Sequence, residues 1–125
     1  MSVVKILLLE DDRWQADIYE SQMKSEGYQV LVVDSPHDAA LAIDEFLPDV
    51  VVADVLLKGN TIFPLLHELA SYEDTWDLPI VLITTEAGLI KDLDLSQYGV
   101  VDILDKSLMD LGDIVVSIRR ILHED

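Results

Sequence analysis

The segment KILLLEDD (residues 5–12) decides the fold class of this chain, because a continuous aliphatic run leads directly into three acids. A short run of this kind, without polar alternation, is typical of a strand that is buried on both faces of a parallel sheet. Three later segments have the same form and also end in acidic, hydroxyl or basic side chains. They are VVVAD (50–54), IVLITT (80–85) and VVDILDK (100–106).

Helical segments separate the strands along the whole chain. Ser35 followed by Pro36 predicts one helix start, since a hydroxyl caps the helix and proline suits its first turn. Strands that alternate with helices imply right-handed crossovers, a parallel sheet and helices on both of its faces. We therefore predict a three-layer α/β fold. The predicted strands are 3–9, 28–33, 50–54, 80–83 and 100–104; the predicted helices are 13–26, 36–47, 62–71 and 108–122, with a weak helix over 86–97.

The composition limits the class of protein. The chain has 125 residues, half of them hydrophobic, which suits one domain spanning residues 1–125. It carries 25 acids against 8 bases, a net charge of −17, so we expect no direct binding to nucleic acid. The sequence lacks cysteine, a signal-peptide pattern and an apolar stretch long enough to cross a membrane. These features predict a cytoplasmic protein without membrane contact.

Polar side chains follow the predicted strands at the point where each strand ends. Glu10 and Asp11 follow the first strand, and Asp54 ends the third. In parallel sheets these carboxyl ends share one edge, where ligands bind. Clustered carboxylates repel unless a cation is present, and a set of oxygen ligands selects a hard ion such as Mg²⁺. Thr84 and Lys106, from the fourth and fifth strands, would reach a phosphoryl group there.

The ordered set of these residues resembles the receiver domain of two-component response regulators. That family has an acidic pair after the first strand, a phosphoacceptor Asp after the third, Ser or Thr after the fourth and Lys after the fifth. The matching residues are Glu10, Asp11, Asp54, Thr84 and Lys106. The resemblance implies a flavodoxin-like sheet of strand order 2-1-3-4-5.

The resemblance also implies a role for each residue of the site. Asp54 would accept a phosphoryl group, Lys106 would pair with it and Thr84 would move toward it. Asp11 and Asp54 would bind Mg²⁺ directly, together with the backbone carbonyl of Leu56. Glu10 would act through a coordinated water.

The function implied is that of a phosphorylation-controlled signalling domain, not of a metabolic enzyme. A sensor histidine kinase or phosphotransfer protein would phosphorylate Asp54, and the change would switch a surface that binds a downstream protein or an output domain. Because the sequence ends at Asp125, we expect either a stand-alone regulator or part of a longer one. The alternatives are a docking module that works without phosphorylation, a flavin- or nucleotide-binding domain, which the acidic first loop disfavours, and a phosphatase, whose D-x-D motif is missing.

Two departures from the family pattern favour the docking alternative. Ile103 stands where the family often has an aromatic switch residue, and Ser107 stands where it usually has proline after the lysine. We expect a trans bond before Ser107, or a shifted loop between the last strand and the last helix, because a cis bond to a residue other than proline costs about 2.5–4 kcal/mol.

Residues outside the site carry smaller predictions. We predict that Trp14 and Trp76 cover edges of the core. For Arg119 and Arg120 two interpretations stay open: solvated side chains, or ion pairs across a homodimer.

Overall fold

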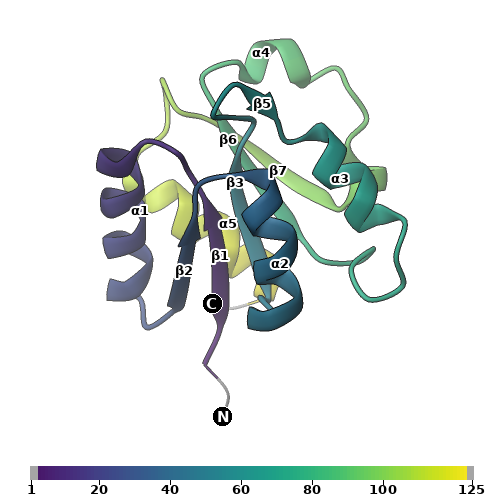
Figure 1. The fold of residues 1–125 in the computed structure, drawn as a ribbon. Helices are drawn as coiled ribbons and strands as arrows, with labels where there is room; N and C mark the ends of the chain where they lie inside the picture. The colour runs from purple at the N-terminus through teal and green to yellow at the C-terminus, as the bar shows by residue number, and fades with distance from the viewer. Residues whose placement is uncertain (1–2, 124–125) are drawn as a thin grey trace.

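A five-stranded parallel sheet forms the centre of the computed structural model, which describes residues 3–123 (Figure 1). The strand order is β2-β1-β3-β6-β7, which is the predicted order 2-1-3-4-5. The predicted fold class is therefore confirmed. The strands of this sheet are β1 (Lys5–Leu9), β2 (Gln29–Val33), β3 (Val50–Asp54), β6 (Ile80–Thr84) and β7 (Val100–Asp105).

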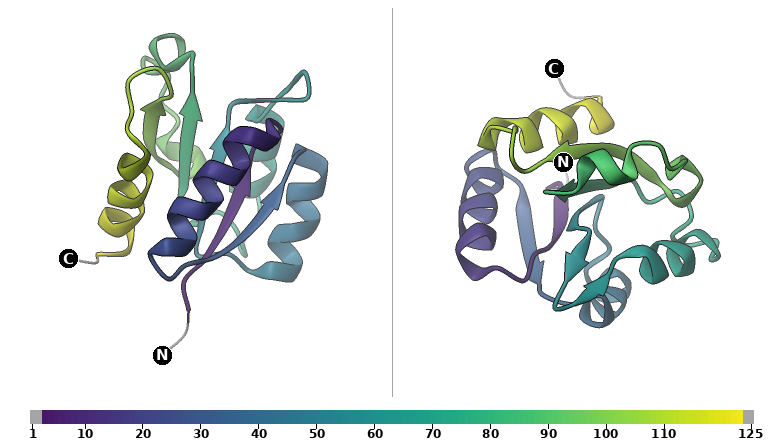
Figure 2. Two further views of the ribbon diagram at one scale, coloured as in Figure 1. Left: turned by 90° about the vertical axis from the view of Figure 1, so that its left-hand side faces the viewer. Right: turned by 90° about the horizontal axis from the view of Figure 1, so that it is seen from above.

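Helices cover both faces of the sheet, as Figure 2 shows. A small antiparallel hairpin follows β3 at the carboxyl end of the sheet. Its strands are β4 (Leu56–Leu57) and β5 (Asn60–Thr61). The helices are α1 (Arg13–Ser25), α2 (Pro36–Phe46), α3 (Phe63–Ala70), α4 (Ala87–Ile90) and α5 (Leu111–Leu122), with a 3₁₀ turn at Ser96–Tyr98.

The aliphatic strands fill two separate cores because successive side chains point to opposite faces of the sheet. Leu7 and Leu9 of β1 pack with the core under α2 and α3. Ile6 and Leu8 pack with the core under α1 and α5. All four side chains are fully buried, which explains why this strand reads as a continuous apolar run.

Side-chain caps fix where two of the helices begin. Asp12 caps α1 by accepting a hydrogen bond from the backbone amide of Gln15 at 3.0 Å, so α1 starts directly after β1. Ser35 caps α2 by accepting from the amide of Asp38 at 3.2 Å, and Pro36 occupies the first turn as predicted. Both caps place a helix start next to the carboxyl end of the sheet.

Two predicted helices are shorter in the structure. The segment 86–97 forms only α4 and the 3₁₀ turn, and Asp94 accepts hydrogen bonds from both the amide and the hydroxyl of Ser96. Such local bonds compete with the helix. The last helix begins after Asp110, which forms a capping box with Asp113, so Leu108 lies outside it and is 81% exposed.

The prediction that both tryptophans cover edges of the core is wrong, because both side chains are largely exposed. The exposed fractions of Trp14 and Trp76 are 77% and 59%. Trp14 lies in the first turn of α1 with its side chain toward solvent, and Trp76 lies in the loop after α3.

The two arginines of α5 have exposed side chains, as the solvated interpretation expects, and each also lies near a carboxylate of the same chain. Arg119 pairs with Glu26 at the end of α1. Arg120 lies 3.8 Å from the carboxylate of Asp102, which also accepts a hydrogen bond from Ser117 at 2.7 Å. These pairs tie α5 to α1 and to β7.

The edge strand β7 contains a register shift. Ile80 lies opposite Val100, but Val81 lies opposite Asp102, so Val101 has no partner on β6. Val101 is 55% exposed.

Within residues 3–123, none of the helices combines the length and apolar character needed to cross a membrane.

Candidate functional site

Three carboxylates meet at the carboxyl end of the sheet, as the sequence predicts. One oxygen from each of Glu10, Asp11 and Asp54 lies within 4.8 Å of the other two. Glu10 and Asp11 follow β1, Asp54 ends β3, and the two strands are paired neighbours. Glu10 is buried, Asp54 is half-buried and Asp11 is exposed, so the cluster opens to solvent on one side.

The carboxylate cluster is of the right size and chemistry for Mg²⁺. The three donors are oxygens, which a hard cation prefers. Oxygens on opposite sides of a bound Mg²⁺ lie about 4.2 Å apart, since each Mg–O bond is about 2.1 Å. A spread of up to 4.8 Å is slightly larger than that. The cluster therefore offers oxygen ligands close to the spacing that Mg²⁺ needs, and which of them would bind it directly stays a prediction.

Lys106 holds two of the carboxylates together. Its ammonium lies 2.6 Å from Glu10 Oε1 and 2.6 Å from Asp54 Oδ2. Lys106 follows β7, and its backbone amide donates to the carbonyl of Thr84 at 2.9 Å, which fixes the base of the side chain. The Lys106 side chain is only 10% exposed, so solvent screens these ion pairs weakly.

The pKa values of Glu10 and Lys106 are both raised, for different reasons. Burial raises the pKa of Glu10, because a carboxylate loses hydration there, and Lys106 offsets only part of this effect. Burial by itself would lower the pKa of Lys106, but its hydrogen bonds to Asp54 and Glu10 outweigh it and raise the pKa. The ammonium therefore stays charged at neutral pH.

Gln15 completes the surroundings of Lys106, and the sequence analysis missed it. Its side-chain Oε1 accepts a hydrogen bond from the Lys106 ammonium at 2.6 Å and from the Tyr19 hydroxyl at 3.4 Å. The ammonium also lies 5.9 Å from the centre of the Tyr19 ring. The available signal was position: Gln15 lies in the first turn of a helix that starts at the predicted site.

The hairpin after β3 holds Asp11. The backbone amide of Lys58 donates to Asp11 Oδ2 at 2.8 Å, and the Lys58 ammonium lies 2.8 Å from Asp34 at the end of β2. Hydrogen bonding to Asp34 raises the pKa of Lys58, and the same bond lowers the pKa of Asp34. The hairpin thus bridges the ends of three strands.

The sequence model of the response regulator receiver domain matches residues 6–119. The chain belongs to this receiver domain family.

Known structures and sequences agree with this assignment. A putative response regulator from Chloroflexus aurantiacus is 26% identical, with a TM-score of 0.87 over 98% of this chain and 100% of that one. The receiver domain of the sensor histidine kinase PA1611 from Pseudomonas aeruginosa is 23% identical, with a TM-score of 0.83 over 95% of this chain and 97% of that one. That structure holds a magnesium ion in its active-site cleft.

A longer protein carries a related segment. The uncharacterized 76.5 kDa protein in the phbC 3′ region of Thiocystis violacea is 33% identical over 95 residues, which are 76% of this chain but 14% of that protein. The receiver domain described here therefore spans only a small part of that relative's length.

The remaining predicted residues of the receiver pattern lie around the carboxylates. The Thr84 hydroxyl is buried and accepts a hydrogen bond from the amide of Glu86 at 2.9 Å. The amide of Leu56 donates to Asp54 Oδ1 at 3.4 Å. Asp12 belongs to the α1 cap, apart from the three clustered acids. The roles predicted for these residues stay predictions.

The two departures from the family pattern have clear local structures. Ile103 is half-buried and packs against the core under α2 and α3. The amide of Ser107 donates to Asp105 Oδ1 at 2.8 Å, which closes a short turn after β7. The described residues contain no cis peptide bond, so the predicted trans bond before Ser107 is confirmed.

Proposed function

We propose that this receiver domain accepts a phosphoryl group on Asp54 in the presence of Mg²⁺, from a histidine kinase or a phosphotransfer protein. The modification would switch a surface that binds a downstream protein or an output domain. The main support is the position of Asp54, which lies between two further carboxylates and an ammonium. As a receiver, the domain is a signalling module and not a metabolic enzyme.

The proposed transfer moves a phosphoryl group between two side chains. A carboxylate oxygen of Asp54 attacks the phosphorus of the phosphohistidine. The new O–P bond forms as the P–N bond breaks, and the imidazole leaves with the electron pair and takes a proton from water. The product is an aspartyl phosphate, and the reaction needs no oxidant or reductant.

The residues of this chain fit a magnesium ion. Asp11 and Asp54 would bind it directly, with the backbone carbonyl of Leu56, and Glu10 would bind through water. When bound, Mg²⁺ neutralises charge on the carboxylates and on the phosphoryl oxygens. The magnesium ion in the PA1611 receiver supports this assignment.

Lys106 and Thr84 would stabilise the phosphorylated form. The Lys106 ammonium already contacts Asp54 Oδ2 at 2.6 Å, so a short movement would bring it to a phosphoryl oxygen. Thr84 lies one position beyond Ile83, the β6 residue paired with Asp54. The Thr84 hydroxyl accepts its hydrogen bond from the Glu86 amide, so its own proton is available to be donated to a phosphoryl oxygen.

Labelling with acetyl phosphate and Mg²⁺ tests the proposal. Intact-mass measurement should show a gain of one phosphoryl group in the wild type and none in Asp54→Asn. Asp12→Asn is the matched control, because it makes the same chemical change at the residue directly after the acidic pair, and asparagine still caps a helix. It should label like the wild type. If the wild type gains no phosphoryl group from acetyl phosphate or from a kinase, the result would favour the docking module that works without phosphorylation.

A further inference from the structure

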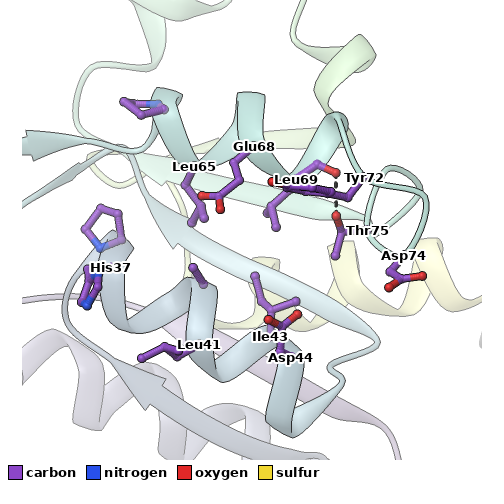
Figure 3. A pocket seen from close by; sticks show the side chains of 13 residues that line it. His37, Leu41, Ile43, Asp44, Leu65, Glu68, Leu69, Tyr72, Asp74 and Thr75 are labelled. Atoms are coloured by element: carbon purple, nitrogen blue, oxygen red, sulfur yellow. Dashed lines mark hydrogen bonds between the residues drawn. The ribbon is translucent and has the colours of Figure 1, made fainter.

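A groove separates α2 from α3 on the face of the sheet opposite α1 and α5 (Figure 3). We call it the α2–α3 groove, and its volume is about 610 Å³. Buried Ile43, Leu65 and Leu69 lie along its floor. The Thr75 hydroxyl donates to the carbonyl of Leu69 at 2.6 Å, so the loop after α3 forms a fixed wall at one end. No residue of the carboxylate cluster lines it.

Exposed apolar side chains extend the groove to the surface. Leu41 on α2 is 56% exposed and Tyr72 after α3 is 59% exposed, and both line it. A second hollow shares Ile43 and Asp44 with the groove and continues it to Leu47, which is 65% exposed. An open groove with an apolar floor suits the apolar ridge of a helix better than a small enclosed ligand.

The rim of the α2–α3 groove is acidic. Asp44, Glu68 and Asp74 line it, and no lysine or arginine does. Figure 3 shows the Glu68 side chain extending from α3 toward α2. In residues 3–123 none of the three carboxylates forms an ion pair, in contrast to those of Glu26, Asp34 and Asp102. An occupant with cations beside its apolar ridge would complement this rim.

We propose that the α2–α3 groove docks a cationic amphipathic segment of a partner protein, with leucine-like side chains on the floor and lysine or arginine against the rim. The charge of the chain argues against other occupants. A second copy would bring the same acidic rim and a net charge of −17. Nucleic acid and anionic lipid would be repelled for the same reason. The proposal does not depend on phosphorylation of Asp54.

The probe for this proposal is a synthetic helical peptide of about 16 residues, long enough to hold helix. Leucines at i, i+3, i+4 and i+7 form one ridge, and lysines flank it. Amide chemical-shift mapping on the whole chain should place the largest changes in α2, α3 and the loop 72–78. Binding should weaken as salt rises, because rim charges are screened.

Matched variants separate the groove from general acidity. Asp44→Asn with Asp74→Asn should weaken the peptide about fivefold or more, whereas Asp17→Asn with Asp92→Asn removes the same charge elsewhere and should change binding less than twofold. Leu41→Asn should weaken it about tenfold, while Leu89→Asn, at a 75% exposed position on α4, should not.

Three results would overturn the proposal. One is equal loss of binding in the two aspartate pairs. Another is equal affinity for a peptide in which alanines replace the leucines, since charge alone would then explain binding. The third is absence of groove shifts at millimolar leucine–lysine peptide. Phosphorylation of Asp54 is measured separately, so failure here leaves the proposed function standing.

Discussion

Lys106 is the residue on which the electrostatics of the site depend. Its ammonium donates hydrogen bonds to the carboxylates of Glu10 and Asp54 and to the neutral amide oxygen of Gln15, each at 2.6 Å. Because the pKa of Lys106 is raised above its ordinary value of 10.5, its stabilising effect is fully present below pH 10.5 and is lost only as pH rises through the higher folded value. The carboxylates nevertheless outnumber it.

Replacing Glu10 by glutamine tests this excess of negative charge. Burial raises the pKa of Glu10 above 4.5, so the folded state binds the proton more tightly than the unfolded chain. Stability from this group is present below pH 4.5 and falls as pH rises through the folded pKa. Glu10→Gln should therefore gain stability relative to the wild type between about pH 5 and pH 8, with little difference at about pH 4.

Urea unfolding across that pH range measures the effect. The exposed Glu45→Gln variant on α2 is the control, and its difference from the wild type should remain within about 0.5 kcal/mol. A Glu10→Gln variant that becomes less stable relative to the wild type as pH rises would contradict the prediction.

Gln15 should contribute to stability through its bond to the ammonium. Gln15→Met keeps the length of the side chain and removes the acceptor, so the free energy of unfolding should fall by about 1–2 kcal/mol. Gln22→Met makes the same change on the same helix. Within residues 3–123 the Gln22 side chain forms no comparable bond, so the free energy of unfolding should change by less than about 0.5 kcal/mol. Equal effects in chemical denaturation would argue against a role for the bond.

At the scale of elements, the turn into β7 depends on a glycine. Gly99 has φ of +82°, and a Cβ there would lie 2.7 Å from the carbonyl oxygen of Leu78. Gly99→Ala should cost about 1–3 kcal/mol of stability. A Cβ added at Gly88 in α4 would have no atom within 4 Å. Gly88→Ala should therefore stabilise the protein by about 0.5–1 kcal/mol. Thermal unfolding of the two variants should shift in opposite directions.

The three central strands were predictable because their apolar runs are buried on both faces and end at polar residues. The strand order was implied by the family resemblance. The helices were less predictable. The segment 86–97 contains too few regularly spaced apolar residues, and the local bonds of Asp94 decide its structure instead. The start of α5 depends on the reciprocal bonds of Asp110 and Asp113, which apolar spacing does not reveal.

The site was partly predictable for a related reason. Strand ends brought Glu10, Asp11 and Asp54 together, since parallel strands end at one edge. Gln15 and the Lys58 amide were missed because they reach the site from a helix and a hairpin tip. Their contacts depend on tertiary geometry, for which the sequence has no periodic signal.

At the scale of the whole molecule, magnesium should stabilise the folded chain. The ion would bind the carboxylate cluster, which exists only when β1 and β3 are paired. At ten times its Kd, a ligand of the folded state adds about 1.4 kcal/mol to the free energy of unfolding. The melting temperature should therefore rise by a few degrees in MgCl₂.

Ionic strength needs a separate control, because a chain with a net charge of −17 is stabilised by any salt that screens repulsion. Potassium chloride at equal ionic strength should give the smaller shift. In Asp11→Asn the two salts should act alike, and a magnesium-specific gain that survives in this variant would place the ion elsewhere.

The unpaired Val101 has a consequence for how the sheet ends. A strand adding to the outer side of β7 would need evenly spaced amide and carbonyl groups, and the register shift between Val100 and Asp102 interrupts that spacing. The shift therefore makes the outer side of β7 a poor template for a strand of another molecule. The same irregularity that displaces one valine should thereby disfavour aggregation through this edge.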